Sequence, residues 1–355
     1  MTVFPFQRSI IKGISVVRLK SPIFAQFELT PFCQNNCVFC YNIWKEGGLS
    51  NSKALSRNQV NIILDKLLAC EVFSIIYSGG EPTLYRFLTE AIHKMAYQKV
   101  EVSMISNGLL FTKDGFLQRL LDAGLTSIQI SMHHFKRKIN DQITQNAASF
   151  ELCRNGIRKA LDVFGPEGIS VNMVVCKPTV TDVYQMGQFL HNLGVTQFSA
   201  GMVSYSGLAA KNNLLVDGKD LIKVYRQLEK LNTDLGMDVG FTGGMPLCLV
   251  PGNGYKGVVQ VANVCDAAIN QVVIGPDGGI RPCVEWPETL GSALTQDIAE
   301  VWLKSPEFNE IREFRNTPKS CRSCGFVADC HGGCRASAWR FSGEKTGPDP
   351  LREAL

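Results

Sequence analysis

Several features are scarce in this chain of 355 residues. It has only five histidines, a net charge of only +4, and no uninterrupted apolar run long enough to span a membrane. The first residues contain no apolar block followed by a small-residue cleavage site, so we predict no signal peptide. The mild charge argues against nucleic-acid binding, and the one dense basic run, Lys136–Lys138, is typical of a solvated loop. We therefore expect a cytoplasmic protein that binds neither nucleic acid nor a membrane.

Cysteine, in contrast, is abundant, with thirteen residues in the chain. Disulfides are rare in the cytoplasm, so this number indicates metal or redox chemistry. Ten cysteines lie in two regions, residues 33–40 and 248–334. The other three are isolated, and we predict that Cys70, Cys153 and Cys176 pack as small buried apolar side chains.

Strand-like and helix-like patterns alternate from residue 24 to about residue 205. Six such repeats predict a parallel α/β sheet, either an open doubly wound sheet or an incomplete barrel. In both folds the chemistry belongs at the C-terminal ends of the strands. The predicted strands are residues 23–30, 72–78, 100–106, 127–132, 169–175 and 196–203. The predicted helices are residues 56–70, 86–96, 113–124, 149–163, 181–193 and 218–235.

The composition changes near residue 240, after which glycine, proline and cysteine are frequent and long periodic segments are few. The exception is a helical pattern over residues 297–315, which Pro306 interrupts. A segment with so little core-building pattern needs another source of stability, which metal sites would supply. We therefore predict an N-terminal extension (1–23), an α/β core (24–240) and a small cysteine-rich domain (241–355).

Three cysteines follow the first predicted strand in the spacing C-x3-C-x2-C: Cys33, Cys37 and Cys40. Thiolates select zinc, Cu(I) or iron–sulfur clusters. Three thiolates can hold a [4Fe–4S] cluster by three of its irons and leave the fourth iron open to a substrate. The alternative is a zinc ion completed by a distant histidine, but no histidine lies near this loop in the sequence.

This loop, with Phe39 directly before Cys40, resembles the C-x3-C-x-aromatic-C signature of the radical S-adenosylmethionine (SAM) enzymes. The resemblance implies a partial (β/α)6 TIM-like barrel and a [4Fe–4S] cluster on Cys33, Cys37 and Cys40. It also implies that SAM binds the open iron through its amino and carboxylate groups. An electron from an external flavodoxin- or ferredoxin-like donor would then cleave SAM to a 5′-deoxyadenosyl radical.

Two further segments at predicted strand ends match this family in the expected order. Gly79, Gly80 and Glu81 resemble its GGE motif, whose backbone contacts the methionine amino group of SAM. Glycines suit that role because a ligand can approach their backbone closely; a simple strand-ending turn is the alternative. Ser106 and Asn107 resemble the segment that helps to line the SAM pocket.

The fourth and fifth predicted strands match the family less fully. Ser131 stands where relatives commonly carry serine, but the aspartate expected two positions later is His133. His133 is our candidate catalytic acid, base or hydrogen-bond donor, with a purely structural histidine as the alternative. Asn172 would either face the cofactor or satisfy the backbone.

The C-terminal cysteines form a second pattern. Twelve residues separate Cys265 from Gly278, and four separate Gly278 from Cys283. The spacing C-x2-C-x5-C-x3-C then places Cys321, Cys324, Cys330 and Cys334. Taken alone, these cysteines would also suit a zinc site. Beside the upstream motif they resemble the SPASM extension, which binds two auxiliary iron–sulfur clusters.

The resemblance implies a ligand set for each auxiliary cluster. Cys265, Cys283 and Cys334 would bind the first, with Cys248 as its fourth ligand, and Cys321, Cys324 and Cys330 would bind the second. Relatives complete the second cluster with a cysteine in the tail, but no cysteine follows Cys334, and Arg352 stands near that place. Three alternatives follow: Asp349 supplies an oxygen ligand, the site is open to water or substrate, or the second cluster is absent. We therefore expect one or two auxiliary clusters.

The resemblance also implies a class of reaction. Auxiliary clusters can accept the substrate's electron, which favours an oxidative crosslink, thioether or dehydrogenation. Our main expectation is a maturase of ribosomally made peptides. Because only about 23 residues precede the first strand, a separate precursor-binding protein or direct docking would recruit the peptide. The alternatives are a small-molecule dehydrogenase or epimerase, acting on an aminosugar-like or tetrapyrrole substrate, and an iron–sulfur carrier.

Overall fold

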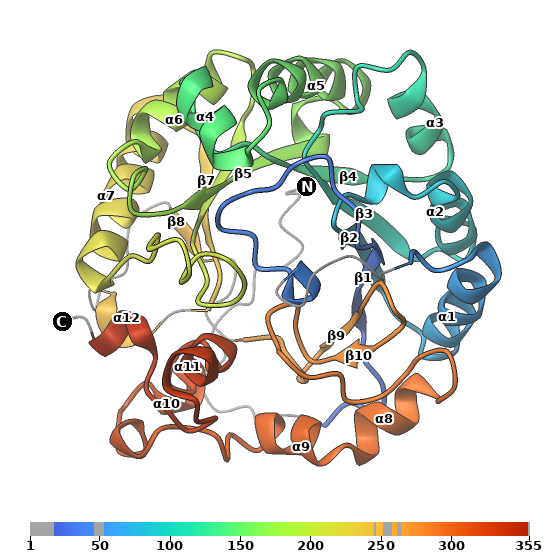
Figure 1. The fold of residues 1–355 in the computed structure, drawn as a ribbon, viewed down its shortest axis with the longest axis vertical. Helices are drawn as coiled ribbons and strands as arrows, with labels where there is room; N and C mark the ends of the chain where they lie inside the picture. The colour runs from blue at the N-terminus through green and yellow to red at the C-terminus, as the bar shows by residue number, and fades with distance from the viewer. Residues whose placement is uncertain (1–17, 46–52, 245, 251–257, 261–264, 354–355) are drawn as a thin grey trace.

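The fold is given by a computed structural model, which describes residues 18–45, 53–244, 246–250, 258–260 and 265–353. One sheet of ten strands runs through the described chain in the order β10-β9-β1-β2-β3-β4-β5-β6-β7-β8 (Figure 1). All neighbouring strands are parallel except β9 and β10. The strands are β1 (Phe24–Thr30), β2 (Ser74–Gly79), β3 (Glu101–Ser106), β4 (Ser127–Ser131), β5 (Ile169–Val175), β6 (Gln197–Met202), β7 (Asp238–Thr242), β8 (Val258–Gln260), β9 (Gln271–Ile274) and β10 (Ile280–Arg281).

Helices surround this curved sheet on its outer side, with α1 to α7 around most of it and the later helices along the remaining side (Figure 1). The helices are α1 (Arg57–Ala69), α2 (Leu88–Tyr97), α3 (Phe116–Asp122), α4 (Arg137–Thr144), α5 (Ser149–Phe164), α6 (Val183–His191), α7 (Gly218–Leu235), α8 (Ile298–Lys304), α9 (Pro306–Arg312), α10 (Val327–Cys330), α11 (Arg335–Ser342) and α12 (Pro350–Glu353). None of the helices in these described ranges is long and apolar enough to cross a membrane.

The predicted fold class is confirmed: the sheet is open, mostly parallel, and built from βα repeats in chain order. All six predicted strands are present as β1 to β6. Ser56 and Gln59 form the capping box that begins α1. The predicted helical segment is also divided into α8 and α9 at the predicted proline, because Pro306 lacks an N–H group and occupies the first turn of α9.

Several elements were not foreseen from the sequence, among them α4 and β7. The basic run expected in a solvated loop instead begins α4, an amphipathic helix that buries Ile143 and Thr144. The short strand β7 pairs with β6 and lies across residue 240, where we expected the core to end. Its sequence, DVGFT, is too short and too polar to show a clear strand pattern. The sheet also continues into the C-terminal part of the chain through β8, β9 and β10.

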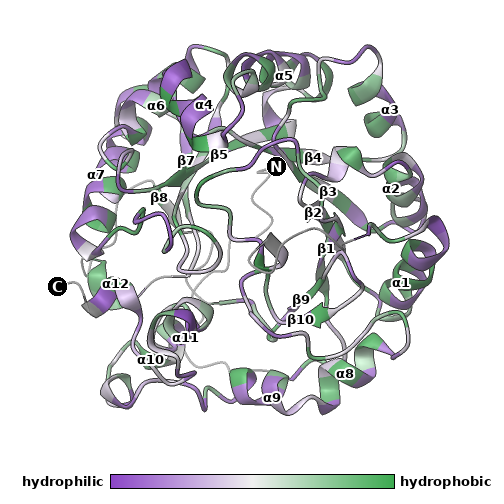
Figure 2. Cartoon of the chain, viewed as in Figure 1, coloured by the Kyte–Doolittle hydropathy of each residue, from purple (hydrophilic) through white to green (hydrophobic). Residues whose placement is uncertain are grey.

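The sheet has two chemically different faces, because side chains alternate along each strand. On the outer face, buried residues such as Phe27, Tyr77 and Met104 pack against the helices in one continuous core. The isolated Cys70, Cys153 and Cys176 are buried, as predicted. Each outer helix carries both hydrophilic and hydrophobic colour in Figure 2, which fits one face on the sheet and one in water. The inner face is polar; it includes Gln26, Glu28, Ser103, Gln129, Ser131, Asn172, Ser199 and Thr242.

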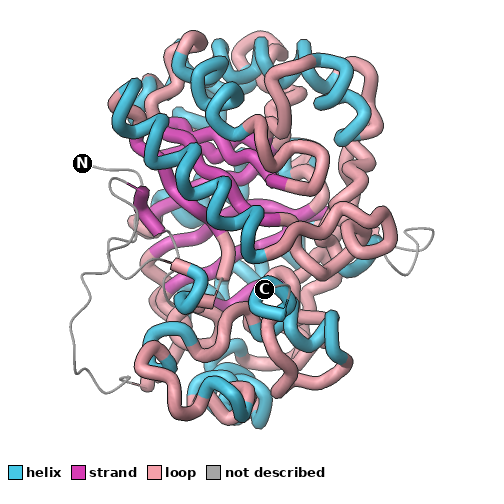
Figure 3. Tube along the Cα trace, turned by 90° about the vertical axis from the view of Figure 1, so that its left-hand side faces the viewer, coloured by secondary structure: helices cyan, strands magenta, loops and turns pink. Residues whose placement is uncertain are grey.

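A buried ion pair joins the core strands to the C-terminal part. Glu28 on β1 pairs with Arg281 on β10, and both side chains are almost completely buried. Arg281 also donates to the carbonyl of Val284. Figure 3 shows the strands crossing the middle of the molecule, with helices and loops above and below them. The polar inner face and the cysteine-rich segment are therefore parts of one connected structure.

Candidate active site

The loop after β1 carries Cys33, Cys37 and Cys40, all partly exposed. Two backbone hydrogen bonds tie this loop to the end of α4: Asn36 N–H donates to the Thr144 carbonyl at 2.9 Å and Val38 N–H to the Ile143 carbonyl at 2.9 Å. The helix that the sequence did not predict therefore holds the three thiols in place.

Phe39 holds the same loop through its buried side chain. Its side chain is buried in a small apolar cluster with Ile143, Cys176 and Val203. The edge of the ring also meets the His133 ring at 87°, with 4.8 Å between the ring centroids. Burial of this aromatic side chain fixes the loop between Cys37 and Cys40, while a contact with SAM stays a prediction.

The glycines after β2 are needed for close chain packing. A side chain on Gly80 would place its Cβ 2.2 Å from the Phe32 carbonyl oxygen, and one on Gly79 would lie 2.7 Å from that of Thr30. The N–H groups of Gly80 and Glu81 donate to these two carbonyls at 2.7 Å each. The glycines thus bring β2 against the start of the cysteine loop, a reason that the sequence motif did not reveal.

Glu81 is a buried carboxylate that joins the ends of β2 and β3. Its Oε1 accepts hydrogen bonds from Thr83 N–H at 3.2 Å, from the Thr83 hydroxyl at 2.7 Å and from the Ser106 hydroxyl at 2.7 Å. Its Oε2 accepts the Asn107 N–H at 2.7 Å. Burial raises the pKa of Glu81, and these four donors act in the opposite direction by favouring its ionised form. Glu81 therefore orients the Ser106–Asn107 segment.

Asn107 carries this connection on to the cysteine loop. Its Nδ2 lies 3.7 Å from Cys33 Sγ and donates to Gln34 Oε1 at 3.0 Å. Its Oδ1 accepts the Leu109 N–H at 3.0 Å, which fixes the amide orientation. The GGE and Ser-Asn-Gly segments, matched separately in the sequence, are thus joined to one of the three thiols through a single hydrogen-bond network.

His133 is buried behind Phe39. Its ring Nδ1 accepts the Val174 backbone N–H at 3.3 Å, and the backbone N–H of His133 donates to Asn140 Oδ1 at 3.2 Å. Burial lowers the pKa of His133 to about 4, so the ring is neutral near pH 7. These contacts support the structural alternative, and a catalytic role for His133 stays a prediction.

We expect His133 to make the protein less stable in mild acid. A histidine that stays neutral in the folded state binds its proton only after unfolding, so stability is complete above the unfolded pKa of about 6.5 and declines towards pH 4. Between pH 7 and pH 5 the loss is roughly 2 kcal/mol. Thermal unfolding of the wild type and of His133→Gln across this range measures it. An unchanging difference between the two proteins would contradict the expectation.

Ser131 and Asn172 lie side by side on the inner face, as register partners on β4 and β5. Asn172 Oδ1 accepts hydrogen bonds from the Ser199 hydroxyl at 2.8 Å and the Thr242 hydroxyl at 3.1 Å. Both Ser131 and Asn172 remain partly exposed. Asn172 thus faces the interior of the partial barrel, and the unpredicted strand β7 helps to orient it.

The C-terminal cysteines fall into two groups. The first, the Cys248 group, consists of Cys248, Cys321, Cys324 and Cys330, which all line one small cavity of about 90 Å³. The backbone N–H of Leu247 donates to Cys330 Sγ at 3.3 Å, which ties the 3₁₀ helix η5 (Leu247–Leu249) to this group. The family resemblance assigned Cys248 to the other group. In this structure Cys248 lies beside Cys321, Cys324 and Cys330, because η5 packs against the segment that carries Cys330, and the cluster that Cys248 would bind stays a prediction.

The second, the Cys334 group, consists of Cys265, Cys283, Cys334 and Glu285. Cys334 Sγ lies 3.8 Å from Glu285 Oε2. Burial raises the pKa of Cys283, and the nearby Cys265 and Glu285 charges raise it further. Burial likewise raises the pKa of Cys265 to about 11, with a smaller contribution from Glu285. Sequence reasoning missed Glu285, although its position two residues after Cys283 was visible.

Asp349 was a candidate ligand of the cluster at Cys321, Cys324 and Cys330, but both of its carboxylate oxygens accept backbone hydrogen bonds. Oδ2 accepts the Cys334 N–H at 2.7 Å and Oδ1 accepts the Leu351 N–H at 2.9 Å. Burial raises the pKa of Asp349 to about 6. Asp349 does not line the cavity of the Cys248 group. Arg352 does line it, and the Arg352 guanidinium donates to Cys321 Sγ at 3.1 Å.

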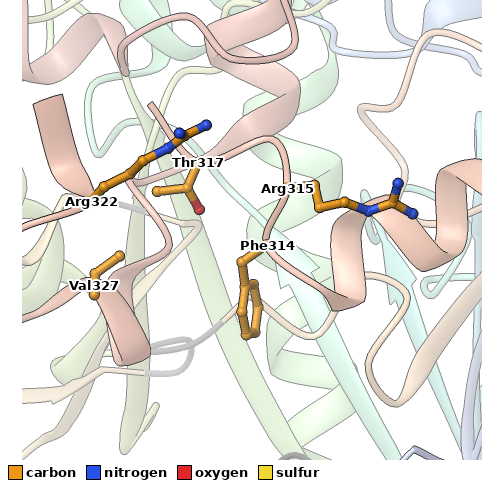
Figure 4. A pocket seen from close by; sticks show the side chains of 5 residues that line it. All are labelled: Phe314, Arg315, Thr317, Arg322 and Val327. Atoms are coloured by element: carbon orange, nitrogen blue, oxygen red, sulfur yellow. The ribbon is translucent and has the colours of Figure 1, made fainter. Parts of the chain in front are cut away.

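A separate, shallow surface pocket of about 520 Å³ lies in the C-terminal part, next to the Phe314 ring that stacks on His331. It is lined by Phe314, Arg315, Thr317, Arg322 and Val327. In Figure 4 the Arg315 side chain points away from Thr317 and Arg322. No thiol of either group lines it, so it is not part of the cysteine sites.

The donor sets of this structure fit iron–sulfur clusters and a polar cofactor. Thiolates are the ligands that hold iron–sulfur clusters, and three cysteines follow β1 while seven more lie in the C-terminal part. Two buried polar atoms near the three-cysteine loop, Glu28 Oε1 and Gln34 Nε2, also lack a partner among the described residues, which suits a polar ligand.

Comparisons with known proteins agree with this chemistry. Residues 27–190 match the radical SAM superfamily, and residues 265–325 match the SPASM iron–sulfur cluster-binding domain. Mycofactocin maturase MftC of Mycobacterium tuberculosis is 26% identical over 337 residues, which is 94% of this chain and 83% of that protein. PqqA peptide cyclase of Bradyrhizobium diazoefficiens is 25% identical over 342 residues, which is 93% of this chain and 85% of that protein.

Among solved structures, Streptococcus suis SuiB bound to its precursor peptide SuiA has a TM-score of 0.76 and 19% identity, covering 93% of this chain and 75% of SuiB. This likeness shows a shared fold. The two family matches together cover more than half of the chain. The chain therefore carries a radical SAM domain over residues 27–190, a domain that binds SAM at a [4Fe–4S] cluster, and a SPASM domain over residues 265–325, which binds auxiliary iron–sulfur clusters.

Proposed function

We propose that this enzyme oxidatively modifies a ribosomally made peptide, forming a crosslink, a thioether or a similar bond. The observation that carries the proposal is the extent of the similarity to PqqA peptide cyclase, which spans 93% of this chain. A match of that length runs through the three-cysteine loop and the C-terminal cysteines. The fold shared with SuiB, which was solved with a precursor peptide, adds support.

The chain's own residues divide the work of this site. When bound, the cluster and SAM supply the 5′-deoxyadenosyl radical that removes a hydrogen atom from the substrate. Cys33, Cys37 and Cys40 would hold the cluster, and the Asn107 amide would orient the first of these thiols from 3.7 Å. The polar inner face, including Ser131 and Asn172, would offer hydrogen bonds to SAM.

The same proposal names the partners that the reaction needs. A flavodoxin- or ferredoxin-like protein would deliver the electron for SAM cleavage in the cytoplasm. The auxiliary clusters of the SPASM domain would accept the electron left on the substrate after hydrogen removal. A separate precursor-binding protein, or direct docking, would bring the peptide to the open side of the barrel.

An anaerobic assay tests the proposal. The reconstituted enzyme, reduced with dithionite and supplied with SAM, should release 5′-deoxyadenosine. Short peptides encoded beside the gene should increase this release, and one of them should lose the mass of two hydrogen atoms for each new bond. Cys37→Ala, which removes one thiolate of the open-iron site, should abolish both products. Liquid chromatography with mass spectrometry measures them in one sample.

The outcomes separate the proposal from its alternatives. Release of 5′-deoxyadenosine that no encoded peptide stimulates, but that an aminosugar or tetrapyrrole does, would replace the peptide with a small-molecule substrate. Intact SAM in the reduced, iron-loaded wild type would remove the enzymatic proposal and leave an iron–sulfur carrier.

A further inference from the structure

The two C-terminal groups offer different sets of donor atoms. The Cys248 group offers four thiols, whereas the Cys334 group offers three thiols and one carboxylate. This division matters because the sequence pattern left the Cys321, Cys324 and Cys330 site one cysteine short. The fourth thiol that the tail does not supply comes instead from η5, far upstream in the sequence.

Three contacts hold the Cys248 group together. Cys248, Cys321, Cys324 and Cys330 surround the same cavity. The Leu247 N–H bond to Cys330 Sγ at 3.3 Å fixes the residue next to Cys248 against this cavity. Arg352 then donates to Cys321 Sγ at 3.1 Å and to the Ser320 hydroxyl at 3.0 Å. The Arg352 guanidinium thus occupies the tail position where a fourth cysteine was expected. Its positive charge offsets part of the negative charge of the four thiolates.

Glu285 completes the Cys334 group in a comparable way. Its Oε2 lies 3.8 Å from Cys334 Sγ, and the Ser337 N–H donates to that same sulfur at 3.4 Å. The Glu285 backbone is held in place as well, because its carbonyl accepts the Ser206 hydroxyl at 3.2 Å. Glu285 is partly buried, forms side-chain hydrogen bonds with Ser204 and Ser337, and lies near the Arg340 charge, so its carboxylate is held in a fixed position beside the three thiols. Carboxylate oxygen also binds iron in many proteins.

We propose that Glu285 is the fourth protein ligand of the auxiliary cluster at Cys265, Cys283 and Cys334, and that Cys248 completes a four-thiolate site with Cys321, Cys324 and Cys330. The proposal rests on the auxiliary clusters of the SPASM domain and extends the proposed function by assigning their ligands. The Cys334 cluster then has one oxygen ligand, which a substrate thiol would displace more readily than a cysteine thiolate.

The experiment uses the full chain with Cys33, Cys37 and Cys40 replaced by alanine, reconstituted anaerobically with iron and sulfide. All remaining cluster iron then belongs to the auxiliary sites. Glu285→Gln, Cys334→Ala, Cys248→Ala and Cys324→Ala are added one at a time to this parent. Iron and sulfide counts, electron paramagnetic resonance after dithionite reduction, and redox titration give the readouts. None of these uses SAM cleavage, so the result is independent of the proposed function.

We expect the variants to separate into two pairs. Glu285→Gln and Cys334→Ala should alter one resonance component, and Cys248→Ala and Cys324→Ala should alter the other. Each should also speed iron release from its own cluster to a chelator by at least about tenfold. Glu285→Gln should raise the midpoint potential of its component, because a neutral amide replaces an anionic ligand. Glu285→Cys should restore parental iron content with a four-thiolate spectrum.

Matched controls keep each half of the proposal open to refutation. Glu288→Gln makes the same charge change on an exposed residue of the same loop and should leave spectra and iron release at parental values. A change in the Cys334 component on Cys248→Ala would return Cys248 to the first group. Parental spectra, potential and release rates in Glu285→Gln would remove Glu285 as a ligand. Circular dichroism identifies any variant that is misfolded. If Glu285→Gln is misfolded, the iron content and spectrum of Glu285→Cys show whether residue 285 is a ligand.

Discussion

Gly207→Ala is expected to reduce the iron held by Cys33, Cys37 and Cys40 at least about tenfold and to abolish SAM cleavage. A Cβ at this position would lie 1.9 Å from the Cys40 carbonyl oxygen and 2.7 Å from Tyr41 Cα, and both neighbours are backbone atoms that cannot swing away. The Cys40 carbonyl also accepts the Leu208 N–H at 2.9 Å, so the two segments cannot simply separate. The cysteine loop must therefore shift.

The chain provides a matched control for this prediction. Gly236 has φ +65°, close to the +71° of Gly207, but nothing lies within 4 Å of the Cβ that alanine would add there. Both substitutions carry the same backbone strain of about 1 kcal/mol, so their difference isolates the collision with the cysteine loop. Iron and sulfide counts and 5′-deoxyadenosine release measure the effect. Equal iron content in Gly207→Ala and Gly236→Ala would show that the loop tolerates the added methyl group.

Glu81→Gln is expected to destabilise the folded enzyme by about 3 kcal/mol and to abolish SAM binding. The two carboxylate oxygens accept bonds from the backbone N–H groups of Thr83 and Asn107, one on each oxygen. Whichever way the glutamine amide is turned, its NH₂ group faces one of these N–H donors. A buried donor is then left without an acceptor, and the Ser106–Asn107 segment loses its alignment with Cys33.

Thermal unfolding and SAM binding of the anaerobically reconstituted proteins test this expectation. Glu90→Gln is the control, because Glu90 is exposed on α2 and its ion pair with Arg57 lies at the surface, where such pairs contribute at most about 1 kcal/mol. Glu90→Gln should bind SAM as the wild type does. If Glu81→Gln unfolds at the wild-type temperature and still binds SAM, the buried carboxylate does not organise the site.

Much of the site could be predicted from the sequence because its signals are local. Cys33, Cys37 and Cys40 lie within eight consecutive residues, so their spacing can be recognised without a structure. The capping box at Ser56 and Gln59 is likewise a contact between near neighbours. The order of strands followed from hydrophobic patterns that repeat along a parallel sheet. Each of these features depends on residues only a few positions apart.

The features that the sequence did not reveal are contacts between distant segments. Thr144 and Ile143 on α4 hold the cysteine loop across more than a hundred residues, and no local pattern announces this. The glycine motif at Gly79 and Gly80 was visible, but its physical reason, collision with the backbone of residues 30–32, required the packing of β2 on β1. The Glu28–Arg281 pair joins residues 253 positions apart, so neither residue looked unusual alone.

The chain's own pattern determined the radical SAM and SPASM motifs and the parallel sheet, because short spacings and strand periodicity can be read along the sequence. Only the tertiary structure decided which C-terminal cysteines lie close to one another. Cys248 precedes Cys321 by 73 positions, and its partners depend on how η5 packs against the segment of Cys330. Sequence spacing shows which residues are close along the chain, whereas the ligands of one cluster must be close in space. Only the fold determines which distant residues come together.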